Sequence, residues 1–147
     1  MTIKPITDND LEPCAKVFVR AYNQAPWNYQ WNLEDALNYL REYTLSGQFK
    51  GFILWDNEVL SGAMLAHTKT WWTGGQLYID ELFIDPDLQK HGYGKMLIDY
   101  AEQFAAEQGL GTITLMTHKF MPAMKFYEDI DFMHAQPLVI LFKQVGI

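Results

Sequence analysis

The stretch ELFIDPDLQKHGYGKMLIDYAE, from Glu81 to Glu102, decides how this sequence folds. It starts with strand-forming residues, stops at Pro86, passes through a loop that holds Gly92 and Gly94, and continues as an amphipathic helix. Glycines leave main-chain N–H groups open, and the start of a helix adds unpaired amides and the positive end of its dipole. This order predicts a binding site for an anion such as a pyrophosphate, and the alternative is a plain turn.

Two common nucleotide-binding motifs do not fit this loop. The third glycine of the dinucleotide fingerprint is missing and no short βαβ unit precedes the loop, while the G-K-[ST] of a Walker loop does not follow it. The sequence therefore disfavours both of these nucleotide-binding motifs.

The composition indicates a compact globular protein. The chain has 147 residues, of which 49% are hydrophobic, and this length fits a single domain over residues 1–147 with a real core. The apolar runs are too short to span a bilayer and the N-terminus lacks the features of a leader, so we expect a cytoplasmic protein without a membrane partner. A net charge of −7 disfavours nucleic acid and favours a cationic small molecule as partner.

Chemistry based on cysteine or metal is not indicated. Cys14 is the only cysteine, so an internal disulfide is impossible, and its helical neighbours predict a buried core thiol rather than a nucleophile. No cluster of residues has the spacing of metal ligands, and we predict no metal site.

Hydrophobic periodicity predicts the remaining elements. Thr7 with Asp10, and Asn32 with Asp35, have the spacing of capping boxes, so we expect helices that begin there and end near positions 22 and 47. An initial strand precedes them, and the later elements are strands at 50–56, 59–71 and 76–85, a helix at 93–108, a strand at 112–117, a helix at 122–128 and one or two closing strands within 132–144. The order β-α-α-β-β-β-α-β-α-β-β predicts an α/β fold with a mixed, strongly twisted central sheet and flanking helices.

The quoted stretch resembles the acyl-coenzyme A signature of the GNAT superfamily of N-acetyltransferases. That family has a loop of the form Q/R-x-x-G-x-G/A, and residues 89–94 read QKHGYG. A second family block, usually A-x-x-F-Y-E-K-x-G-F, is similar to AMKFYEDIDF at residues 123–132. The resemblance implies an enzyme that moves acetyl from acetyl-coenzyme A to a primary amine of a small molecule or peptide, by direct attack in a ternary complex.

Two positions depart from the family pattern. Phe120 stands where the family often has an asparagine, which removes one polar contact to the pantetheine arm. Asp131 replaces the usual glycine, and because aspartate tolerates a left-handed backbone better than most residues, we expect the turn to survive.

The resemblance also implies where the cofactor lies. In the family the fourth strand has a bulge and splays from the fifth, and the pantetheine arm lies between them. Main-chain groups of Leu82, Phe83 and Ile84 would then contact the arm, with an N–H of Leu82 or Phe83 polarising the thioester carbonyl, although the same residues also fit a simple buried strand. The other expected cofactor contacts are Gln89, Lys90, His91, Gly92, Tyr93, Gly94, Lys95, Ala123 and Phe126.

The amine must lose a proton before it attacks, since an amine with a pKa of about 10 is mostly protonated near neutral pH. Asp80 and Glu81 are the candidate bases, and a structural ion pair or cap is the alternative role for either. Strand alternation places Asp80 with Tyr78 and Leu82, and Glu81 on the opposite face, but a bulge would change this by one residue. We favour Asp80.

Histidines give one further candidate base. His118 follows a predicted strand and is either an alternative base or a loop cap, whereas His67 and His134 receive no role.

The departing thiolate needs a proton donor, because a thiol with a pKa of about 8.5 is a poor leaving group without one. By resemblance, Tyr127 in the second family block is this donor. The alternative role for Tyr127 is that of an ordinary core residue.

The family binds its acceptor with the first two helices and the loop between them. Here that loop is AYNQAPWNYQWN, which is rich in aromatic residues that can hold a cation or an apolar body. We expect Tyr22, Trp27 and Trp31 to bind the acceptor, together with Tyr78, and the alternative is that the tryptophans fix the loop to the core. Trp71 and Trp72 are candidates for the opposite wall or for a homodimer contact.

Two functions from other classes remain open. A non-catalytic module that binds or senses acyl-coenzyme A would keep the glycine loop without turnover, although the retention of Tyr127 favours the enzyme. An interaction protein would instead use its tryptophans to bind a partner.

Overall fold

The computed structural model describes residues 1–146 and divides into two compact units, Met1–Met116 and Thr117–Ile147. The first unit contains β1 (Thr2–Pro5), η1 (Asp8–Asp10), α1 (Leu11–Tyr22), α2 (Leu33–Thr44), β2 (Phe49–Asp56), β3 (Val59–Lys69), β4 (Gly75–Ile84), η2 (Pro86–Leu88), α3 (Tyr93–Glu107) and β5 (Leu110–Leu115). The second unit contains α4 (Pro122–Asp129). Whether both units belong to one domain stays a prediction.

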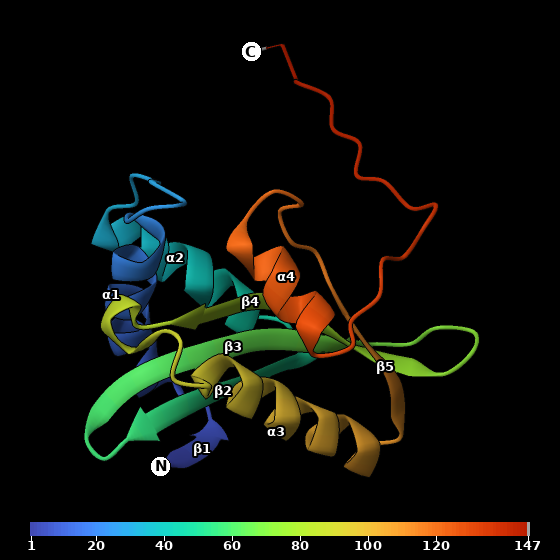
Figure 1. Cartoon of the computed structure of the whole chain (residues 1–147), viewed down its shortest axis with the longest axis horizontal. Helices are drawn as coiled ribbons and strands as arrows, with labels where there is room; N and C mark the ends of the chain where they lie inside the picture. Colours follow the sequence, from blue (N-terminus) through green and yellow to red (C-terminus); the bar gives the residue numbers. More distant parts are fainter. Residues whose placement is uncertain (147) are drawn as a thin grey trace. The chain divides into compact units, whose positions relative to one another are not determined.

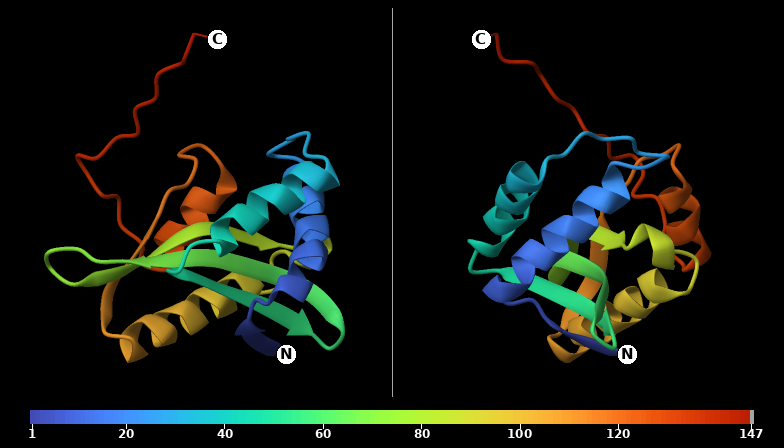
Figure 2. Two further views of the ribbon diagram at one scale, coloured as in Figure 1. Left: turned by 180° about the vertical axis from the view of Figure 1, so that it is seen from behind. Right: turned by 90° about the vertical axis from the view of Figure 1, so that its left-hand side faces the viewer.

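The sheet of the first unit is mixed. Its strands follow the order β1-β2-β3-β4-β5, with antiparallel pairs from β1 to β4 and β5 parallel to β4. Helices α1 and α2 lie on one face of this sheet and α3 lies on the other (Figures 1 and 2). The predicted fold class, a mixed α/β sheet with flanking helices, is confirmed.

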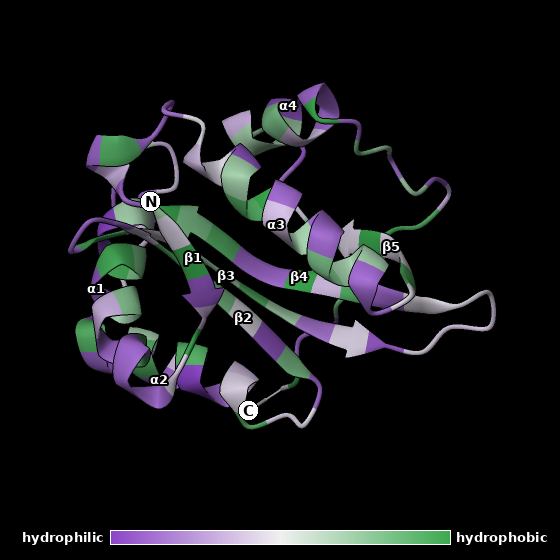
Figure 3. Cartoon of the chain, turned by 90° about the horizontal axis from the view of Figure 1, so that it is seen from below, coloured by the Kyte–Doolittle hydropathy of each residue, from purple (hydrophilic) through white to green (hydrophobic). Residues whose placement is uncertain are grey.

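Each face of the sheet has its own apolar layer. On the side of α1 and α2, side chains such as Phe18, Leu40 and Phe83 form a buried cluster with residues of β2 and β3. On the other side, α3 buries Leu97 and Ile98, and Figure 3 shows this face with apolar segments of the strands beneath the helix. The helices therefore hold the sheet between two cores.

The predicted capping box at Thr7 is present, and at Asn32 the N-cap hydrogen bond is present. The Thr7 N–H donates to Asp10 Oδ2 at 2.8 Å, and the Asp35 N–H donates to Asn32 Oδ1 at 2.8 Å. These side chains pair amides that have no partner inside the helix. The chain after Thr7 first makes the short turn η1, so α1 itself begins at Leu11.

The prediction of one or two closing strands within residues 132–144 is wrong for the structure described here. Residues 132–146 form no helix or strand, and the apolar side chains from Leu138 to Phe142 are 68–88% exposed. β-Branched and aromatic residues give this segment strand propensity. Propensity does not supply the neighbouring strand that must pair with its N–H and C=O groups.

The turn at Asp131 behaves as predicted. Its φ of +74° is left-handed, and the Phe132 N–H donates to the carbonyl of Tyr127 at 3.0 Å. The aspartate therefore adopts the conformation for which the family uses glycine.

Candidate active site

A β-bulge in β4 determines which side chains face the helices α1 and α2. Leu65 of β3 pairs with Glu81, and the next residue, Ala66, pairs with Ile79, so Asp80 is an extra residue in β4. The bulge brings Asp80 and Glu81 to the same face, where each contacts a different polar group.

This corrects the expected alternation along β4. Asp80 shares its face with Tyr78, as predicted, but also with Glu81 and not with Leu82, because the bulge shifts the side-chain alternation by one residue.

Glu81 is a partly buried carboxylate that contacts two phenols. The hydroxyl of Tyr22 donates to Glu81 Oε2 at 3.2 Å, and the hydroxyl of Tyr39 donates to Oε1. Burial raises the pKa of Glu81, the two phenol hydrogen bonds oppose this rise, and the nearby charge of Asp80 adds to it. With its raised pKa, Glu81 can accept a proton nearer to neutral pH than an ordinary glutamate.

Tyr39 and Tyr43 complete this polar group, and sequence reasoning missed both. Their hydroxyls lie 2.8 Å apart, and burial is the first cause that raises the pKa of each. They therefore stay neutral hydrogen-bond donors. Their spacing of four residues on α2, which puts them on one helix face, was the available signal.

Asp80 pairs with His67 of β3. His67 Nδ1 lies 2.7 Å from Asp80 Oδ2, and the imidazole stacks on Tyr78 with ring centroids 5.2 Å apart. The structure thus gives Asp80 a polar partner, His67, which had no predicted role. The signal for His67 was the β3–β4 hairpin register, which places it opposite Tyr78.

The edge of β4 that faces β5 is paired only in part. β5 pairs with β4 from Gly75 to Ile79 and no further. The main-chain groups of β4 beyond the bulge therefore have no strand partner on that edge in the described structure, and Leu82 and Ile84 lie along it. This open edge fits an extended ligand such as a pantetheine arm, which would pair as an added strand does. Phe83 is buried and packs edge-on against Phe18 of α1.

The glycine loop has the conformation that its sequence predicts. Gly92 caps the start of α3 with φ +82°, and a Cβ built there meets no atom within 4 Å. The glycine is thus required by its left-handed backbone and not by close packing. Gln89, Lys90 and His91 are exposed beside it, so the backbone at the start of α3 is accessible to an anion.

Two side chains of the loop have partners inside the protein. Tyr93 is buried, and its hydroxyl donates to Asp56 Oδ2 at 2.8 Å, so its main chain is the part left for a ligand. Lys95 forms an exposed ion pair with Asp99 one helical turn later.

The aromatic loop between α1 and α2 divides into an inner and an outer part. Trp31 packs against Phe18 and Tyr39, with centroids 5.4 and 5.1 Å apart, and its main chain bonds twice to the Asn23 side chain. Trp27 instead packs against Tyr22 at 5.5 Å. The role that fixes the loop to the core therefore suits Trp31 better than Trp27.

Trp71 and Trp72 lie in the turn between β3 and β4. Trp71 is 58% exposed and Trp72 is 86% exposed. Neither of their predicted roles is tested by this geometry.

The predicted residues of the second unit lie in and around α4. The Tyr127 ring contacts Phe126 and Phe132 at centroid distances of 5.1 and 5.3 Å. His118 Nδ1 accepts a hydrogen bond from the Phe120 N–H at 3.1 Å, which is the loop-capping role that the sequence left open. Ala123 lies in the first turn of α4.

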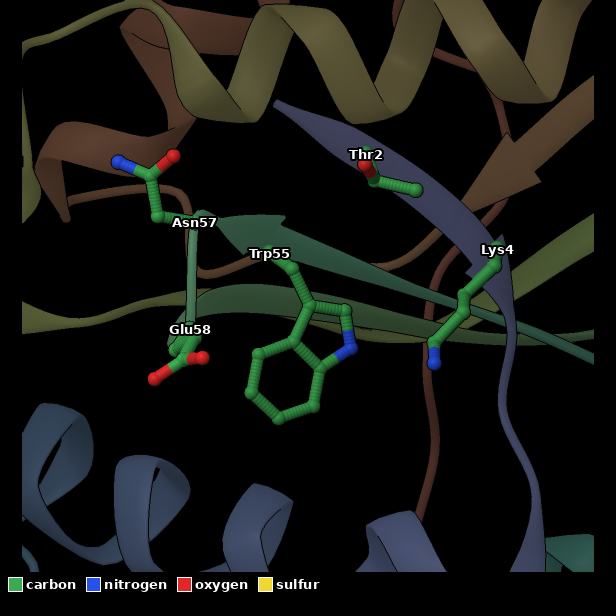
Figure 4. Close-up of a pocket in the computed structure, with 5 residues that line it drawn as sticks. All are labelled: Thr2, Lys4, Trp55, Asn57 and Glu58. Atoms are coloured by element: carbon green, nitrogen blue, oxygen red, sulfur yellow. The ribbon is translucent and has the colours of Figure 1, made fainter.

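A pocket of about 370 Å³ lies elsewhere on the first unit (Figure 4). It is lined by Thr2, Lys4, Trp55, Asn57 and Glu58. The ammonium of Lys4 lies 5.7 Å from the centroid of the Trp55 ring. The pocket contains none of the predicted site residues.

Cysteine and metal chemistry find no support in residues 1–146. Cys14 is buried, and burial followed by the charge of Asp10 raises the pKa of its thiol to about 12. Within the same residues, no group of histidine, cysteine, aspartate and glutamate has an arrangement that would hold a metal ion. None of the described helices has the length and apolar character needed to cross a bilayer.

The bulged β4, its open edge and the glycine loop at the start of α3 define the class of an acyl-coenzyme A N-acyltransferase fold. A model of the acetyltransferase (GNAT) family matches residues 16–132. The chain belongs to this family of acetyltransferase enzymes.

Individual relatives and solved structures agree with this assignment. An uncharacterized N-acetyltransferase of Methanocaldococcus jannaschii is 23% identical over 143 residues, which cover 89% of this chain and 60% of that protein's length. The crystal structure of a possible acetyltransferase from Clostridium difficile 630 matches with a TM-score of 0.81 and 14% identity, covering 99% and 98% of the two chains.

A second solved structure is that of the aminoglycoside antibiotic 6′-N-acetyltransferase AAC(6′)-Ig from Acinetobacter haemolyticus. It matches with a TM-score of 0.78 and 12% identity, covering 99% of this chain and all of that one. Likeness at this level of identity shows a shared fold.

Proposed function

We propose that the protein transfers an acetyl group from acetyl-coenzyme A to a primary amine by direct attack in a ternary complex. The observation that carries this proposal is the bulge at Asp80. At the bulge, β4 presents the carboxylates of Asp80 and Glu81 to the helices α1 and α2. After the bulge, the main-chain groups of β4 on the side of β5 have no strand partner in the described structure. The same short segment thus offers groups for the amine and groups for the thioester.

Acetyl-coenzyme A supplies an activated thioester when bound. The amine nitrogen attacks the carbonyl carbon, the C–N bond forms, the C–S bond breaks and the amine proton passes to a base. A main-chain N–H of Leu82 or Phe83 would stabilise the charge on the carbonyl oxygen, as in an oxyanion hole. Gln89, Lys90, His91 and Gly92, with the first turn of α3 from Tyr93 to Lys95, would hold the pyrophosphate.

We assign the role of base to Glu81 rather than to Asp80, which the sequence alone favoured. Glu81 has a raised pKa and receives hydrogen bonds from neutral phenols. Asp80 is already paired with His67 at 2.7 Å. A base is most effective when its pKa lies near the working pH, which favours Glu81 because its pKa is raised.

The proton for the departing thiolate would come from Tyr127. This role rests on the resemblance of residues 123–132 to the second block of the family, which Ala123 and Phe126 share with Tyr127.

The acceptor class that fits best is a small cationic amine. The chain has a net charge of −7. The hydroxyl of Tyr22 donates a hydrogen bond to Glu81, and the ring of Trp27 packs against the ring of Tyr22. Indole and phenol faces attract cations. The fold is shared with an aminoglycoside 6′-N-acetyltransferase, so aminoglycosides belong among the first candidates. We further propose a cytoplasmic location and no nucleic-acid or membrane partner, with a homodimer as the open alternative to a monomer.

The test is a screen of amines for release of free thiol from acetyl-coenzyme A. The panel contains aminoglycosides, polyamines, amino acids and short peptides, and the Glu81→Gln variant is the control. We expect amine-dependent thiol release by the wild-type protein that the variant loses. A folded wild-type protein that binds coenzyme A and acetylates no member of the panel would favour the binding module instead.

A further inference from the structure

The residue that leads from β4 into the glycine loop is fixed on every side. Asp85 is only 6% exposed, and its carboxylate accepts bonds from the Asp87 N–H at 2.9 Å and from Arg20 at 2.6 Å. Its own N–H donates to the carbonyl of Ser61, and its carbonyl accepts from the Leu88 N–H, both at 2.8 Å. A buried carboxylate needs such partners because ionised oxygen is costly to remove from water.

Arg20 of α1 joins two carboxylates with one guanidinium. One nitrogen donates to Asp85 and the other donates to Asp87 at 2.8 Å, so the two ion pairs enclose Pro86 in η2. The planar fork of arginine makes two directed bonds of this kind, which a lysine ammonium does not reproduce. The short helix η2 is thereby tied to α1.

This ion-paired group lies between the two halves of the proposed site. Two residues after Arg20, Tyr22 donates a hydrogen bond to Glu81. Two residues after Asp87, Gln89 begins the glycine loop, whose far end is fixed by the bond from Tyr93 to Asp56 at 2.8 Å. The loop is therefore held at both ends, and Arg20 holds the end that is nearer to β4.

We propose that Arg20 is a positioning residue for coenzyme A: by holding Asp85 and Asp87 it fixes the start of the glycine loop, so that the N–H groups there face the pyrophosphate. The inference rests on the proposed function, since it takes the loop to be the coenzyme A site. Preorganised binding groups raise affinity because the ligand does not have to order them.

The competing explanation is that Arg20 acts only as a positive charge near an anionic ligand. The two explanations predict opposite changes in the Kd of coenzyme A for the variant Asp85→Asn. This variant keeps an oxygen that can accept from the Asp87 N–H but loses the charged partner of Arg20. A pure charge effect would tighten coenzyme A binding because a negative charge is removed, whereas loss of positioning would weaken it.

The experiment measures the Kd of coenzyme A by calorimetry for five variants, together with the free energy of unfolding of each. We expect Arg20→Met to raise Kd about tenfold, because the loop loses both ion pairs that hold it. Arg20→Lys should raise Kd less, because lysine keeps the positive charge but not the two directed bonds. Asp85→Asn should also raise Kd, and Asp87→Asn, which loses only the exposed ion pair, should have a smaller effect.

Lys16→Met is the matched control. Lys16 lies on the same helix, its removal changes the net charge equally, and within residues 1–146 its ion pair is an exposed one with Glu12. We expect its Kd to equal that of the wild-type protein. In the enzyme assay, Arg20→Lys should raise the KM for acetyl-coenzyme A and leave kcat unchanged at saturation, since Arg20 does not touch the reacting atoms.

Wild-type Kd values for Arg20→Lys and Asp85→Asn, or tighter binding by Asp85→Asn, would overturn the proposal while leaving the proposed function intact. If Arg20→Met does not fold, these two variants decide. If the wild-type protein itself does not bind coenzyme A, the assignment of the cofactor site fails and the positioning role fails with it.

Discussion

At the scale of single residues, Glu81 combines properties that a purely structural carboxylate rarely has. It is partly buried, and the side chains that donate hydrogen bonds to it are the phenols of Tyr22 and Tyr39. Burial of this kind favours the protonated acid, so the native state holds the proton of Glu81 more tightly than the unfolded chain does. A fold accepts such a cost most readily where the group has a chemical task.

We therefore predict that Glu81→Gln lowers kcat by about 10² to 10⁴, the range for loss of a general base, with a folded protein and an unchanged Kd for coenzyme A. The wild-type kcat should rise with pH as Glu81 loses its proton at its raised pKa, and the residual rate of the variant should lack this rise. The pH profile of kcat, measured with a confirmed acceptor, checks both. A full rate with the glutamine in place would assign the base to Asp80 with His67, or to a water relay.

The ionisation of Glu81 should also affect the free energy of unfolding, and the contribution of Glu81 should fall with rising pH whereas kcat rises. Because the folded pKa of Glu81 is raised, its contribution to stability is complete below the unfolded pKa of about 4.3 and is lost as pH rises through the folded pKa. The glutamine variant has no such loss, so its stability relative to the wild-type protein should increase with pH. Urea unfolding of both proteins at several pH values measures this difference.

Tyr127 carries the other proton transfer of the proposed reaction. Phenylalanine keeps the ring that packs against Phe126 and Phe132 and removes only the hydroxyl. We predict that Tyr127→Phe lowers kcat by about 10² and spares folding and the Kd of coenzyme A. Tyr100→Phe, on α3, is the control and should keep the full rate. An unchanged kcat for Tyr127→Phe across neutral pH would remove this residue from the mechanism.

At the scale of secondary-structure elements, the sequence predicts what local chemistry determines. The helix starts at Thr7 and Asn32 follow from side chains that bond to amides three residues away. The glycine loop follows from Gly92, whose left-handed backbone is a local property. These features require no knowledge of distant residues.

Several features that depend on a second segment were not predicted, although the family resemblance implied a bulge in β4. The faces of Asp80 and Glu81 depend on where β3 pairs with β4, and a register shift leaves no mark in the sequence of β4 alone. The contact between Asp80 and His67, and that between Glu81 and Tyr39, require the same long-range information. The closing strands were wrong for a related reason, since strand propensity does not specify a partner.

Helix α3 offers a matched pair of glycines that separates conformation from ligand binding. Gly92 at its start and Gly109 after its end both have positive φ, +82° and +71°, and a Cβ at either would meet no atom within 4 Å. Replacing either by valine should cost stability by about 1–2 kcal/mol, because a side chain is strained in the left-handed region. Only Gly92→Val should also raise the Kd of coenzyme A, since only Gly92 lies in the proposed pyrophosphate loop.

Unfolding by urea and calorimetric titration with coenzyme A measure these two quantities for both variants. Equal Kd values for Gly92→Val and Gly109→Val, in proteins that are folded, would show that the loop at Gly92 is a turn and not the coenzyme A site.

At the scale of the whole molecule, the fold restricts the function to a class without selecting one member of it. Chains of 12–14% identity share this fold, which shows that very different surfaces can be placed on the same sheet and helices. What such chains have in common is the framework, and the side chains that differ between them decide which molecule each one binds. An enzyme, a coenzyme A-binding module and an interaction protein therefore have to be separated by measurements on the intact chain.

Thermal unfolding in the presence of coenzyme A distinguishes a protein that binds coenzyme A from an interaction protein that does not. A ligand that binds only the native state stabilises it by about 2.7 kcal/mol at one hundred times its Kd. For a chain of this length, we expect the midpoint Tm to rise by roughly 5–10 °C. Gly109→Val should keep this rise and Gly92→Val should lose most of it. No rise in the wild-type protein would contradict a coenzyme A site and leave the interaction protein as the better explanation.

An enzyme and a binding module would both show the thermal shift, so a measurement of turnover is needed to distinguish them. Under the same conditions, acetyl-coenzyme A and an accepted amine should release thiol with the wild-type protein, and Glu81→Gln should retain the thermal shift while losing the release. This combination of results would assign the chemistry to Glu81 and the binding of coenzyme A to the loop at Gly92. A thermal shift of full size with no thiol release for any amine would instead mean that the fold binds the thioester without using Glu81 as a base.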